Sequence, residues 1–389
     1  MEAVTLGLPG LNFNLTEEHL AVQEAARDFA QTELMPGVIE RDNAQQFPKE
    51  LIRRMGELGF LGMMVSPEYG GGGMDTVSYV LAMEELSKID ASASVIVSVN
   101  NSLVCYGLES YGTEEQKQKY LMRLATGEAL GAFCLSEPEA GSDATSQQTT
   151  AEDKGDHYLL NGTKNWITNG NSSDICLVIA QTDREKAHRG INCLIVEKGN
   201  PGFVIGKKED KMGIRASDTH SLLFTDVHVP KSNRIGADGF GFKFAMSTLN
   251  GGRIGIAAQA LGIAAGAYEM ALKYSQERRA FGKQIFDHQA IQFKLAEMAT
   301  KIEAARLLVF KAARLKDEGK DYVQAAAMAK LFASDVAMWT TTEAVQVHGG
   351  YGYVKEFHVE RLMRDAKITQ IYEGTSEIQK LVIARELVR

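Results

Sequence analysis

A single apolar seam in the C-terminal third constrains the fold of this chain more than any other feature. Between residues 291 and 315 an apolar side chain recurs every three or four positions: Ile291, Leu295, Met298, Ile302, Ala305, Leu308, Ala312 and Leu315. A helix with that spacing carries one continuous apolar stripe, which must be buried against other helices. Helical patterns at 253–278, 322–347, 357–368 and 377–387 can supply those partners. We therefore predict that the C-terminal region is a four-helix bundle.

The rest of the chain is predicted to be a helical region followed by a β region. Before residue 131 the pattern is helical, and Asn14–Glu17 and Thr113–Gln116 have the form of capping boxes. After it come short strand-like runs, at 158–160, 163–168, 175–180, 191–197, 203–205 and 221–229. Strands at this spacing are typical of a small barrel or sandwich. The pair Asn161-Gly162, between the first two runs, predicts a type I′ hairpin.

The expected fold class is therefore multidomain α+β. It comprises an N-terminal α-helical domain, a middle β-barrel domain and a C-terminal helical bundle domain, at residues 1–130, 131–235 and 236–389. The segment 91–105, rich in small and β-branched residues, is either a core helix or one wall of an apolar ligand tunnel. The sequence does not separate these two interpretations.

Charge and motif content argue against several functions. The net charge is −8, which disfavours a nucleic-acid groove as the main binding surface. No strand–GxGxxG–helix unit is present, which disfavours a nicotinamide-binding Rossmann domain. The run Gly70–Gly73 follows no strand and precedes no GK[ST] sequence, so we interpret it as a connector. His348 has no second ligand at metal-binding spacing and is interpreted as structural, so no metal site is expected.

Cysteine usage and the absence of targeting patterns predict a compartment. The four cysteines show no CxxC or metal spacing and are typical of buried free thiols in a reducing compartment: Cys105, Cys134, Cys176 and Cys193. The segment Met1–Val4 has neither a basic n-region nor an Arg-rich presequence. No apolar run approaches membrane-spanning length. We expect a soluble, cytoplasmic protein.

The main candidate for catalysis is Glu373, within Ile371–Glu377. It lies between two helical patterns, where a side chain can project into a cleft. A carboxylate held there among apolar groups has a raised pKa, as a general base requires. The alternative is an ordinary acid at a helix N-terminus, favoured by the helix dipole. The heptapeptide alone leaves both open.

Four polar segments are candidate ligand-binding loops. Phe133–Asp143 combines Gly and Pro with hydroxyls and acids, and Asn165–Asn169 carries Trp166 at a strand end. A lone tryptophan there usually packs in the core, but beside a hydroxyl-rich loop it can also be the platform for a planar ring. Glu277–Lys283 and Gln346–Gly352 offer arginines and glycines, which suit a pyrophosphate. The alternatives are a surface charge run and a helix C-cap.

Taken together, these segments resemble the acyl-CoA dehydrogenase family over essentially the whole chain. Five motifs match in order: Leu135-Ser136-Glu137-Pro138, Trp166-Ile167-Thr168, Arg278-x-x-Phe281-Gly282, Gln346-x-x-Gly349-Gly350 and Tyr372-Glu373-Gly374-Thr375. The helix–strand–helix order is also the family's. The resemblance implies FAD-dependent conversion of a saturated acyl-CoA to a trans-2-enoyl-CoA. In that chemistry Glu373 removes the α-proton while a hydride passes from the β-carbon to flavin N5.

The resemblance also implies binding roles. The FAD-binding residues it implies are Phe133, Leu135, Ser136, Gly141, Ser142, Trp166, Ile167, Thr168, Arg278, Phe281, Gln289, Gln346, Val347, Gly349, Gly350, Thr375 and Glu377. The acyl-CoA-binding residues it implies are Ser142, Asn250, Arg253, Tyr372 and Gly374. In the family, the counterparts of Arg278, Gln289 and 346–350 reach the FAD of a neighbouring subunit, which implies a homotetramer, a dimer of dimers. The implied electron acceptor is an electron-transfer flavoprotein.

The position of the base bears on the substrate. Isovaleryl and long-chain members carry the base just before the arginine that corresponds to Arg253, where this chain has Gly252. The chain therefore resembles the straight-chain members, and 346–352 and 371–377 resemble the short-chain, butyryl-type enzymes. The alternatives are a short branched or dicarboxylic acyl-CoA as substrate, or a catalytically silent flavoprotein. An acyl-CoA oxidase is disfavoured, because those enzymes are usually much longer.

Overall fold

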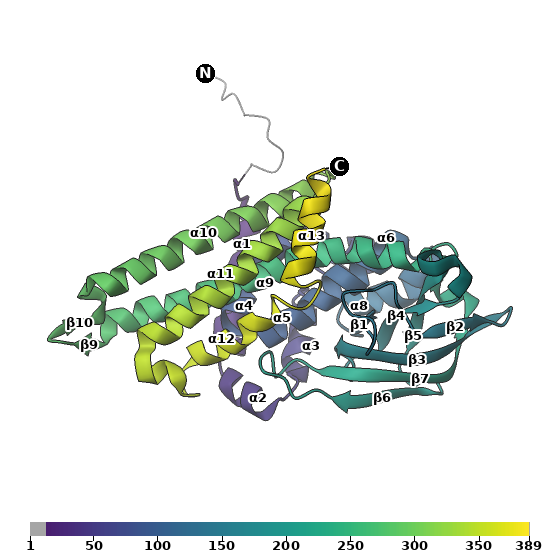
Figure 1. Cartoon of the computed structure of the whole chain (residues 1–389), viewed down its shortest axis with the longest axis horizontal. Helices are drawn as coiled ribbons and strands as arrows, with labels where there is room; N and C mark the ends of the chain where they lie inside the picture. The colour runs from purple at the N-terminus through teal and green to yellow at the C-terminus, as the bar shows by residue number, and fades with distance from the viewer. Residues whose placement is uncertain (1–12, 389) are drawn as a thin grey trace, which may run out of the picture.

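The longest element of the molecule, helix α9, connects its two ends. The computed structural model describes residues 13–388, and the segment Met1–Val4, in which we expected no leader, lies outside the described residues. Helix α9 (Gly241–Glu277) has 37 residues and therefore spans about 55 Å. It starts beside the β-sheet and ends at the small hairpin of β9 (Arg279–Ala280) and β10 (Lys283–Gln284), at the opposite end of the molecule (Figure 1).

The other helices of the C-terminal bundle pack with α9. They are α10 (Gln289–Asp317), α11 (Val323–His348), α12 (His358–Ile368) and α13 (Ser376–Glu386). The predicted seam on α10 is confirmed, because its members are buried or, for Ile291 and Leu308, partly buried. Helix α9 begins at Gly241 rather than at the predicted Arg253. Each glycine costs about 1 kcal/mol in a helix, but Gly251 is buried there, and tertiary packing outweighs that cost.

The N-terminal region is a helical layer that packs against α9. Its helices are α1 (Glu17–Phe29), α2 (Val38–Ala44), α3 (Lys49–Glu57), α4 (Thr76–Ile89), α5 (Ala91–Ser98), α6 (Tyr106–Tyr111), α7 (Glu114–Gln116) and α8 (Met122–Ala125). Short π-helical stretches are Ala30–Leu34, Val99–Cys105 and Lys117–Leu121. Within residues 13–388 the 3₁₀ turns are Pro67–Tyr69, Arg184–Gly190, Lys231–Asn233, Ile285–Asp287 and Gly349–Tyr353. Capping boxes begin α1 at Thr16 and α7 at Thr113.

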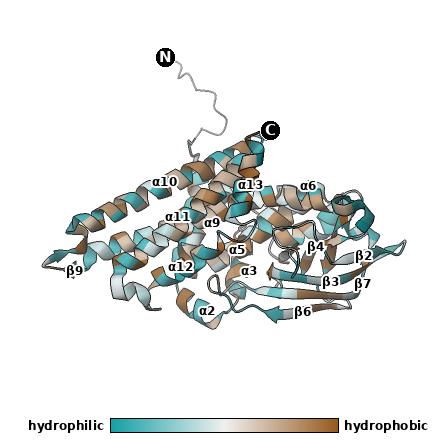
Figure 2. Cartoon of the chain, in the orientation of Figure 1, coloured by the Kyte–Doolittle hydropathy of each residue, from teal (hydrophilic) through white to brown (hydrophobic). Residues whose placement is uncertain are grey.

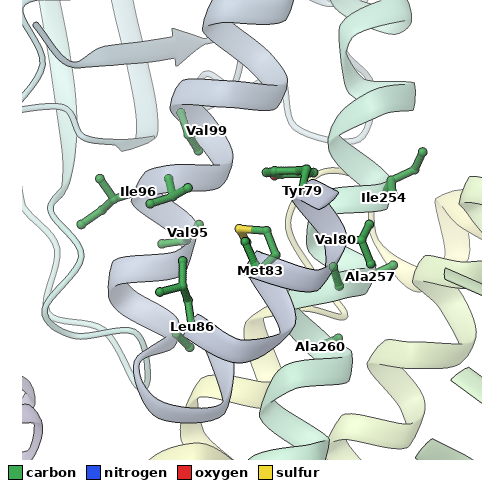
Figure 3. Close-up of a cluster of buried hydrophobic side chains, with 14 of the residues drawn as sticks. Tyr79, Val80, Met83, Leu86, Val95, Ile96, Val99, Ile254, Ala257 and Ala260 are labelled. Carbon is green, nitrogen blue, oxygen red and sulfur yellow. The ribbon is translucent and has the colours of Figure 1, made fainter. Parts of the chain in front are cut away.

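Helices α4 and α9 approach each other closely. A Cβ at Gly262 would lie 2.4 Å from the carbonyl oxygen of Glu84, and one at Gly266 would lie 2.3 Å from that of Lys88. The density of small residues on α9 therefore allows close helix packing, as predicted. Figure 3 shows the apolar contacts among α4, α5 and α9. In Figure 2 polar residues are frequent on the outer helix α10, whereas α9 and α5 are largely apolar.

Two helical stretches are long and apolar enough, by length and composition alone, to cross a membrane. They are Ala91–Tyr111 and Gly241–Glu277, and 94% and 83% of their apolar windows are buried inside the fold. The sequence was expected to contain no such run. Because core helices pass the same test, the burial identifies both stretches as core helices. This also places the segment 91–105 in the core.

The middle region is one eight-stranded sheet. Its strands are β1 (Gly131–Cys134), β2 (Thr150–Asp153), β3 (His157–Thr168), β4 (Ile175–Gln181), β5 (Ile191–Glu197), β6 (Phe203–Lys208), β7 (Thr219–Pro230) and β8 (Arg234–Ile235). Their order is β6-β7-β3-β2-β4-β5-β8, and β1 pairs in parallel with β4. Alternate residues of β4 and β5 enter different cores. Leu177 and Ile195 pack with the helices, whereas Val178 and Leu194 lie in a second core within the β region.

One predicted turn is wrong. Asn161-Gly162 does not close a hairpin, because β3 runs unbroken through it and pairs with both β2 and β7. The β3–β7 register shifts between Leu160 and Gly162, which marks a β-bulge. Asn161 Nδ2 donates to Asp226 Oδ1 over 3.0 Å, and the Asp226 N–H donates to Asn161 Oδ1 over 2.8 Å. Pairing on both sides of β3 outweighs the local preference for a turn.

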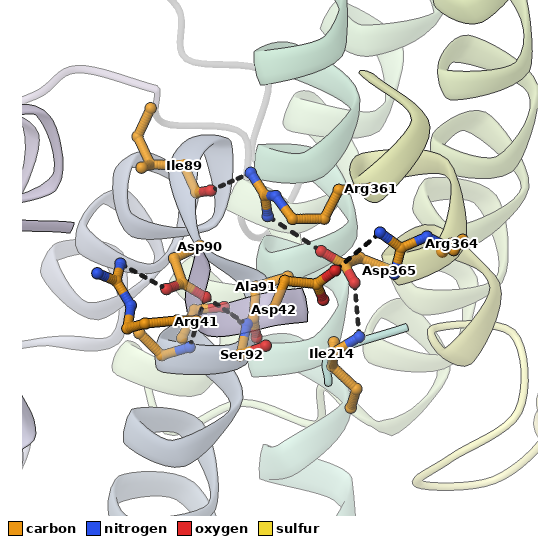
Figure 4. Close-up of polar contacts among 12 residues, drawn as sticks. Arg41, Asp42, Ile89, Asp90, Ala91, Ser92, Ile214, Arg361, Arg364 and Asp365 are labelled. Atoms are coloured by element: carbon orange, nitrogen blue, oxygen red, sulfur yellow. Dashed lines mark hydrogen bonds and ion pairs between the residues drawn. The ribbon is translucent and has the colours of Figure 1, made fainter. Parts of the chain in front are cut away.

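A buried network of charged groups fixes α12 to the other two regions (Figure 4). Arg361 donates to Asp365 over 3.1 Å and to the carbonyl oxygen of Ile89, at the end of α4, over 2.7 Å. Asp365 also accepts from the N–H of Ile214, between β6 and β7, over 2.5 Å. Because α12 leads into residues 369–375, this network positions the turn that follows.

Candidate active site

The turn between α12 and α13 holds Glu373 in an unusual backbone conformation. Glu373 and Gly374 both have positive φ, 51° and 91°, a region that side-chain-bearing residues rarely adopt. Helix α13 begins only at Ser376, and its N-cap is Thr375, whose side chain accepts from the N–H of Ile378 over 3.3 Å. Glu373 is therefore not a helix N-terminal acid, and that alternative is excluded.

The carboxylate of Glu373 points toward α9 at Gly252. Its Oε2 is shielded from solvent and has no hydrogen-bond partner. A Cβ at Gly252 would lie 2.2 Å from that oxygen and 2.8 Å from Leu103 Cδ2, so any larger residue would have to displace both side chains. Burial raises the pKa of Glu373 to about 7, although the positive charges of Lys330 and Arg253 act in the opposite direction.

Two buried side chains that the sequence analysis missed hold this turn. Lys330 Nζ, from α11, donates to the carbonyl oxygen of Gly374 over 2.6 Å. Gln379 Nε2, from α13, donates to the same oxygen over 2.8 Å and to that of Glu373 over 3.3 Å. Burial lowers the pKa of Lys330 to about 8. The sequence feature that could have identified Lys330 is a lysine inside the alanine-rich run of residues 325–333. The neighbouring residues do not show which groups its side chain contacts.

The predicted acyl-CoA-binding residues fall into two places. Arg253, which is buried and adjacent to Gly252, donates from Nη1 to Asn250 Oδ1 over 2.7 Å, while its Nε has no partner. Tyr372, next to Glu373, donates its hydroxyl to Gln259 Oε1. Asn250, Arg253, Tyr372 and Gly374 thus belong to α9 and the Glu373 turn. Ser142 is instead exposed on the loop after β1.

Part of the predicted FAD-binding set lies at the edge of the β region. Trp166 has φ of +60° and is 61% exposed, so its interpretation as a core residue is excluded. The N–H of Asn165 donates to the carbonyl oxygen of Ser136 over 2.8 Å, which joins the two predicted loops. The other members range from buried to exposed: Leu135 and Ile167 are buried, Phe133, Ser136 and Thr168 are half-buried, and Gly141 and Ser142 are exposed.

A buried ion pair, also missed by the sequence analysis, anchors this loop from behind. Lys164 Nζ donates to Glu137 Oε1 and Gln147 Oε1 over 2.6 Å each, and to the carbonyl oxygen of Leu135 over 3.1 Å. Burial lowers the pKa of Lys164 to about 8. Burial alone would raise the pKa of Glu137. The positive charge of Lys164 and the hydrogen bond that Lys164 donates to the carboxylate bring this pKa below its ordinary value.

The remaining predicted FAD-binding residues lie elsewhere. Thr375 and the exposed Glu377 flank the start of α13. The others lie at or near the end of the bundle away from the sheet: Arg278, Phe281, Gln289, Gln346, Val347, Gly349 and Gly350. Some of these line an open cleft of about 590 Å³ with Tyr351, whose ring centroid is 5.4 Å from the guanidinium carbon of Arg278. Phe281 is 95% exposed and has φ of +53°.

Packing accounts for His348 at this end of the bundle. His348 is buried, its Nδ1 lies 2.8 Å from the carbonyl oxygen of Ala344, and its ring stacks on Tyr274 at 4.3 Å. Burial lowers its pKa. Among residues 13–388, no group of three or more His, Cys, Asp or Glu side chains could hold a metal ion.

The two groups of predicted FAD-binding residues are far apart in one chain. Gly252, beside Glu373, and Arg278, at the end of α9, are separated by roughly 40 Å along the helix. Strand β3, which carries Trp166, lies at the end of the molecule opposite the β9–β10 hairpin (Figure 1). The fold therefore gathers the predicted residues into two separate groups, which we call half-sites.

Known proteins resemble this chain along its full length. Three family models match it: acyl-CoA dehydrogenase N-terminal domain at residues 16–128, middle domain at 132–227 and C-terminal domain at 239–388. The short-chain specific acyl-CoA dehydrogenase of Clostridium acetobutylicum is 52% identical, with 97% of this chain and 100% of that protein covered. The structure of butyryl-CoA dehydrogenase from Megasphaera elsdenii has a TM-score of 0.96 and 52% identity, covering 97% of this chain and 100% of that one.

A second solved structure is equally similar. It comes from work on the electron transferring flavoprotein of Acidaminococcus fermentans and flavin-based electron bifurcation. Its matching chain has a TM-score of 0.96 and 55% identity, covering 97% of this chain and 100% of that one.

Proposed function

This chain belongs to the acyl-CoA dehydrogenase family, and on that premise we propose that it oxidises a short, straight-chain acyl-CoA, such as butyryl-CoA, to the trans-2-enoyl-CoA. The names of its relatives, short-chain specific and butyryl-CoA dehydrogenase, support this substrate. The cofactor of the family is FAD.

The observation that carries the proposal is Glu373 Oε2, which is shielded from solvent and has no hydrogen-bond partner. A free glutamate has a pKa of about 4.3 and is a poor base for the α-proton of a thioester. Burial raises the pKa of Glu373 to about 7, which suits proton abstraction near neutral pH. With no hydrogen bond at Oε2, a lone pair is available to the substrate. We therefore assign Glu373 as the residue that removes the α-proton.

The exposed residues of the β region fit a planar ring system. Trp166 presents a 61% exposed indole beside the loop that contains Ser136 and Ser142, and an apolar platform with nearby hydroxyl and amide donors suits an isoalloxazine. The predicted residues of 133–142 and 166–168, with Thr375 and Glu377, would hold the FAD. When bound, FAD supplies the acceptor for the hydride from the β-carbon. Lys164 and Glu137 keep the loop in place for this task.

The acyl-CoA would lie between α9 and the Glu373 turn. Arg253 is buried with an unpaired Nε, and its charge suits an anionic or strongly polar part of CoA. Asn250 holds the guanidinium through Nη1 and completes the polar wall. The backbone N–H of Glu373 would donate to the thioester oxygen, where negative charge develops. Tyr372, Gly374 and Ser142 are the remaining proposed contacts.

We also propose that the second half-site serves a neighbouring subunit in a homotetramer. Arg278, Phe281, Gln289 and 346–350 lie too far from Glu373 to contact the same flavin within one chain. All of these residues except the buried Val347 and His348 are exposed, which supports contact with another chain. For electron transfer we propose an electron-transfer flavoprotein as the acceptor, a relationship supported by the similar chain from the Acidaminococcus work. The four buried free thiols support a reducing compartment such as the cytoplasm.

Anaerobic bleaching of the flavin tests the function directly. Purified holoprotein is titrated in parallel with butyryl-CoA, octanoyl-CoA and isovaleryl-CoA. Loss of flavin absorbance that is greatest with butyryl-CoA is the expected result. Preference for isovaleryl-CoA would contradict the straight-chain assignment, and a flavin-bound protein that responds to none of the three would contradict the enzymatic function.

A further inference from the structure

The face of α9 that contacts Glu373 also contacts a tyrosine, Tyr79. Gly252, Gly255 and Gln259 are spaced by three and four positions, so they lie on the same face of the helix. The first faces the carboxylate of Glu373, and the third accepts the hydroxyl hydrogen bond of Tyr372. A Cβ at Gly255 would lie 2.5 Å from Tyr79 Oη. The Tyr79 hydroxyl is thus about one helical turn, roughly 5 Å, from the base.

Tyr79 fills the space at this point. It projects from α4, is 1% exposed, and donates its hydroxyl to Ser98 Oγ, from α5, over 3.0 Å. Ser98 Oγ itself would lie 2.7 Å from a Cβ at Gly255. Figure 3 shows Tyr79 at the level of Val99 and Ile254, where α4, α5 and α9 meet. The ring and the two hydroxyls therefore form a closed floor across three helices.

The floor belongs to the same space as the carboxylate. Burial raises the pKa of Tyr79, and the charge of Glu373 raises it further. Leu103, on the π-helical continuation of α5, provides an apolar side wall next to Gly252. Because the Tyr79 hydroxyl donates to Ser98 Oγ, the floor presents no unpaired tyrosine hydroxyl to an apolar chain.

We propose that Tyr79 ends the acyl-binding cavity about one helical turn beyond Glu373 and so restricts the enzyme to short acyl chains. The inference rests on the proposed function, because it places the α-carbon of the substrate at the Glu373 carboxylate. From that point only a few further carbon atoms fit before the tyrosine ring. A longer chain would have to displace a fully buried aromatic side chain that is hydrogen-bonded to Ser98.

Enlarging the cavity at position 79 tests the proposal. Tyr79→Leu, Tyr79→Ala and Tyr79→Phe are purified with FAD, and kcat/KM is measured for butyryl-, hexanoyl- and octanoyl-CoA. One methylene in an apolar pocket changes kcat/KM by about 10–200-fold. We expect Tyr79→Ala and Tyr79→Leu to raise the octanoyl-to-butyryl ratio by at least about tenfold. Tyr79→Phe keeps the ring and should keep the wild-type ratio.

Matched controls separate pocket shape from general damage. Leu81→Ala removes a buried side chain from the same helix, but two positions along, on the opposite face. It should leave the ratio unchanged. Flavin content and unfolding midpoint are recorded for every variant, and if Tyr79→Ala does not fold, Tyr79→Leu carries the test.

The possible outcomes are distinct. An unchanged ratio in flavin-loaded Tyr79→Leu, with butyryl-CoA still oxidised by the wild type, overturns the inference and leaves the proposed function standing. An equal rise in Leu81→Ala also overturns it. A wild-type holoprotein that oxidises none of the thioesters overturns the proposed function, and the inference with it.

Discussion

The position of Glu373 implies a loss of stability at neutral pH. Its pKa is about 7 in the folded protein and about 4.5 in the unfolded chain, so between these values the folded state binds more protons. Stability therefore falls as pH rises from 4.5 to 7 and stays lower above 7. Glu373→Gln removes this effect. We expect the variant to be more stable than the wild type by up to about 3 kcal/mol at pH 8, with little difference at pH 4.5.

Urea unfolding of both proteins at several pH values measures this difference. The flavin should be removed from both, so that ligand binding does not enter the comparison. A stability difference that does not depend on pH would contradict the raised pKa. In the holoproteins, Glu373→Gln should keep FAD and lose flavin bleaching by butyryl-CoA.

Lys330 is expected to lower the pKa of Glu373 as well as to hold the turn that contains it. The charged groups that face the carboxylate are Arg253 on α9 and Lys330 on α11, with the neutral Tyr79 on α4. Lys330→Met removes one positive charge, so the pKa of Glu373 should rise further. The rate of butyryl-CoA-dependent bleaching should fall several-fold more at pH 7 than at pH 9.

The conservative replacement distinguishes the two roles of this lysine. Lys330→Arg keeps the charge and should keep the wild-type pH profile, even if its rate is lower. An equal loss at pH 7 and pH 9 in Lys330→Met would mean that the lysine acts only through the hydrogen bond to Gly374.

The role of a side chain could be predicted where it depends on neighbouring residues in the sequence. It could not be predicted where it depends on contacts with distant residues. The candidate base Glu373 was found because an acid between an aromatic residue and a glycine stands out in its own heptapeptide. Lys330 and Lys164 were missed because each meets partners that are distant in the sequence. The platform role of Trp166 was considered but ranked below core packing, since exposure is a property of the folded surface.

At the scale of elements, α12 should depend on its buried ion pair. Arg361 and Asp365 are both buried, and the arginine also satisfies the carbonyl oxygen of Ile89. Removing one partner of a buried pair typically costs about 3–5 kcal/mol, because the other charge is left uncompensated. We expect Arg361→Met to lower the free energy of unfolding by about that amount. Because α12 leads into the Glu373 turn, flavin bleaching should weaken as well.

A surface arginine provides the control for this prediction. Arg53 pairs with Glu50 on the exposed side of α3, and exposed pairs contribute little. Arg53→Met should leave the urea midpoint nearly unchanged. Equal effects of the two substitutions would show that the α12 network is not a structural anchor.

Element boundaries followed the sequence where local pattern and packing agree. The seam of α10 and strands β4 and β5 lie close to their predicted positions, because apolar periodicity and burial specify the same residues. The pair Asn161-Gly162 failed as a hairpin because β2 and β7 flank β3 on both sides. The early start of α9 was missed because Gly251 and Gly252 lower helix propensity, whereas the close contacts of Gly252 with Glu373 and Leu103 appear only in the fold.

At the scale of the whole molecule, the family resemblance implied that the two half-sites belong to different chains, but the motifs did not give the distance between them. Each motif is local, whereas the roughly 40 Å between them follows from the length of α9.

If Arg278 contributes to a neighbour's flavin site, Arg278→Ala should lower the FAD retained after gel filtration without disturbing Glu373. The adjacent Arg279→Ala is the control, because its guanidinium instead donates to the carbonyl oxygen of Gly282. Equal retention in both variants would count against a phosphate-binding role for Arg278.

Mixed oligomers can show whether the half-sites combine within a chain or between chains. Light scattering should first report about four chains per particle, arranged as symmetric pairs in which each chain gives the same surface to the other. Glu373→Gln alone lacks the base, and Arg278→Ala alone retains little flavin, so each homo-oligomer should be nearly inactive.

When the two variants are co-expressed, a mixed pair contains one site with both defects and one site with neither. Activity should then recover to about a quarter of the wild-type value, because about half of the pairs are mixed and each has one intact site. If Arg278 served the flavin of its own chain, every site in a mixed pair would carry one defect, and no recovery would occur.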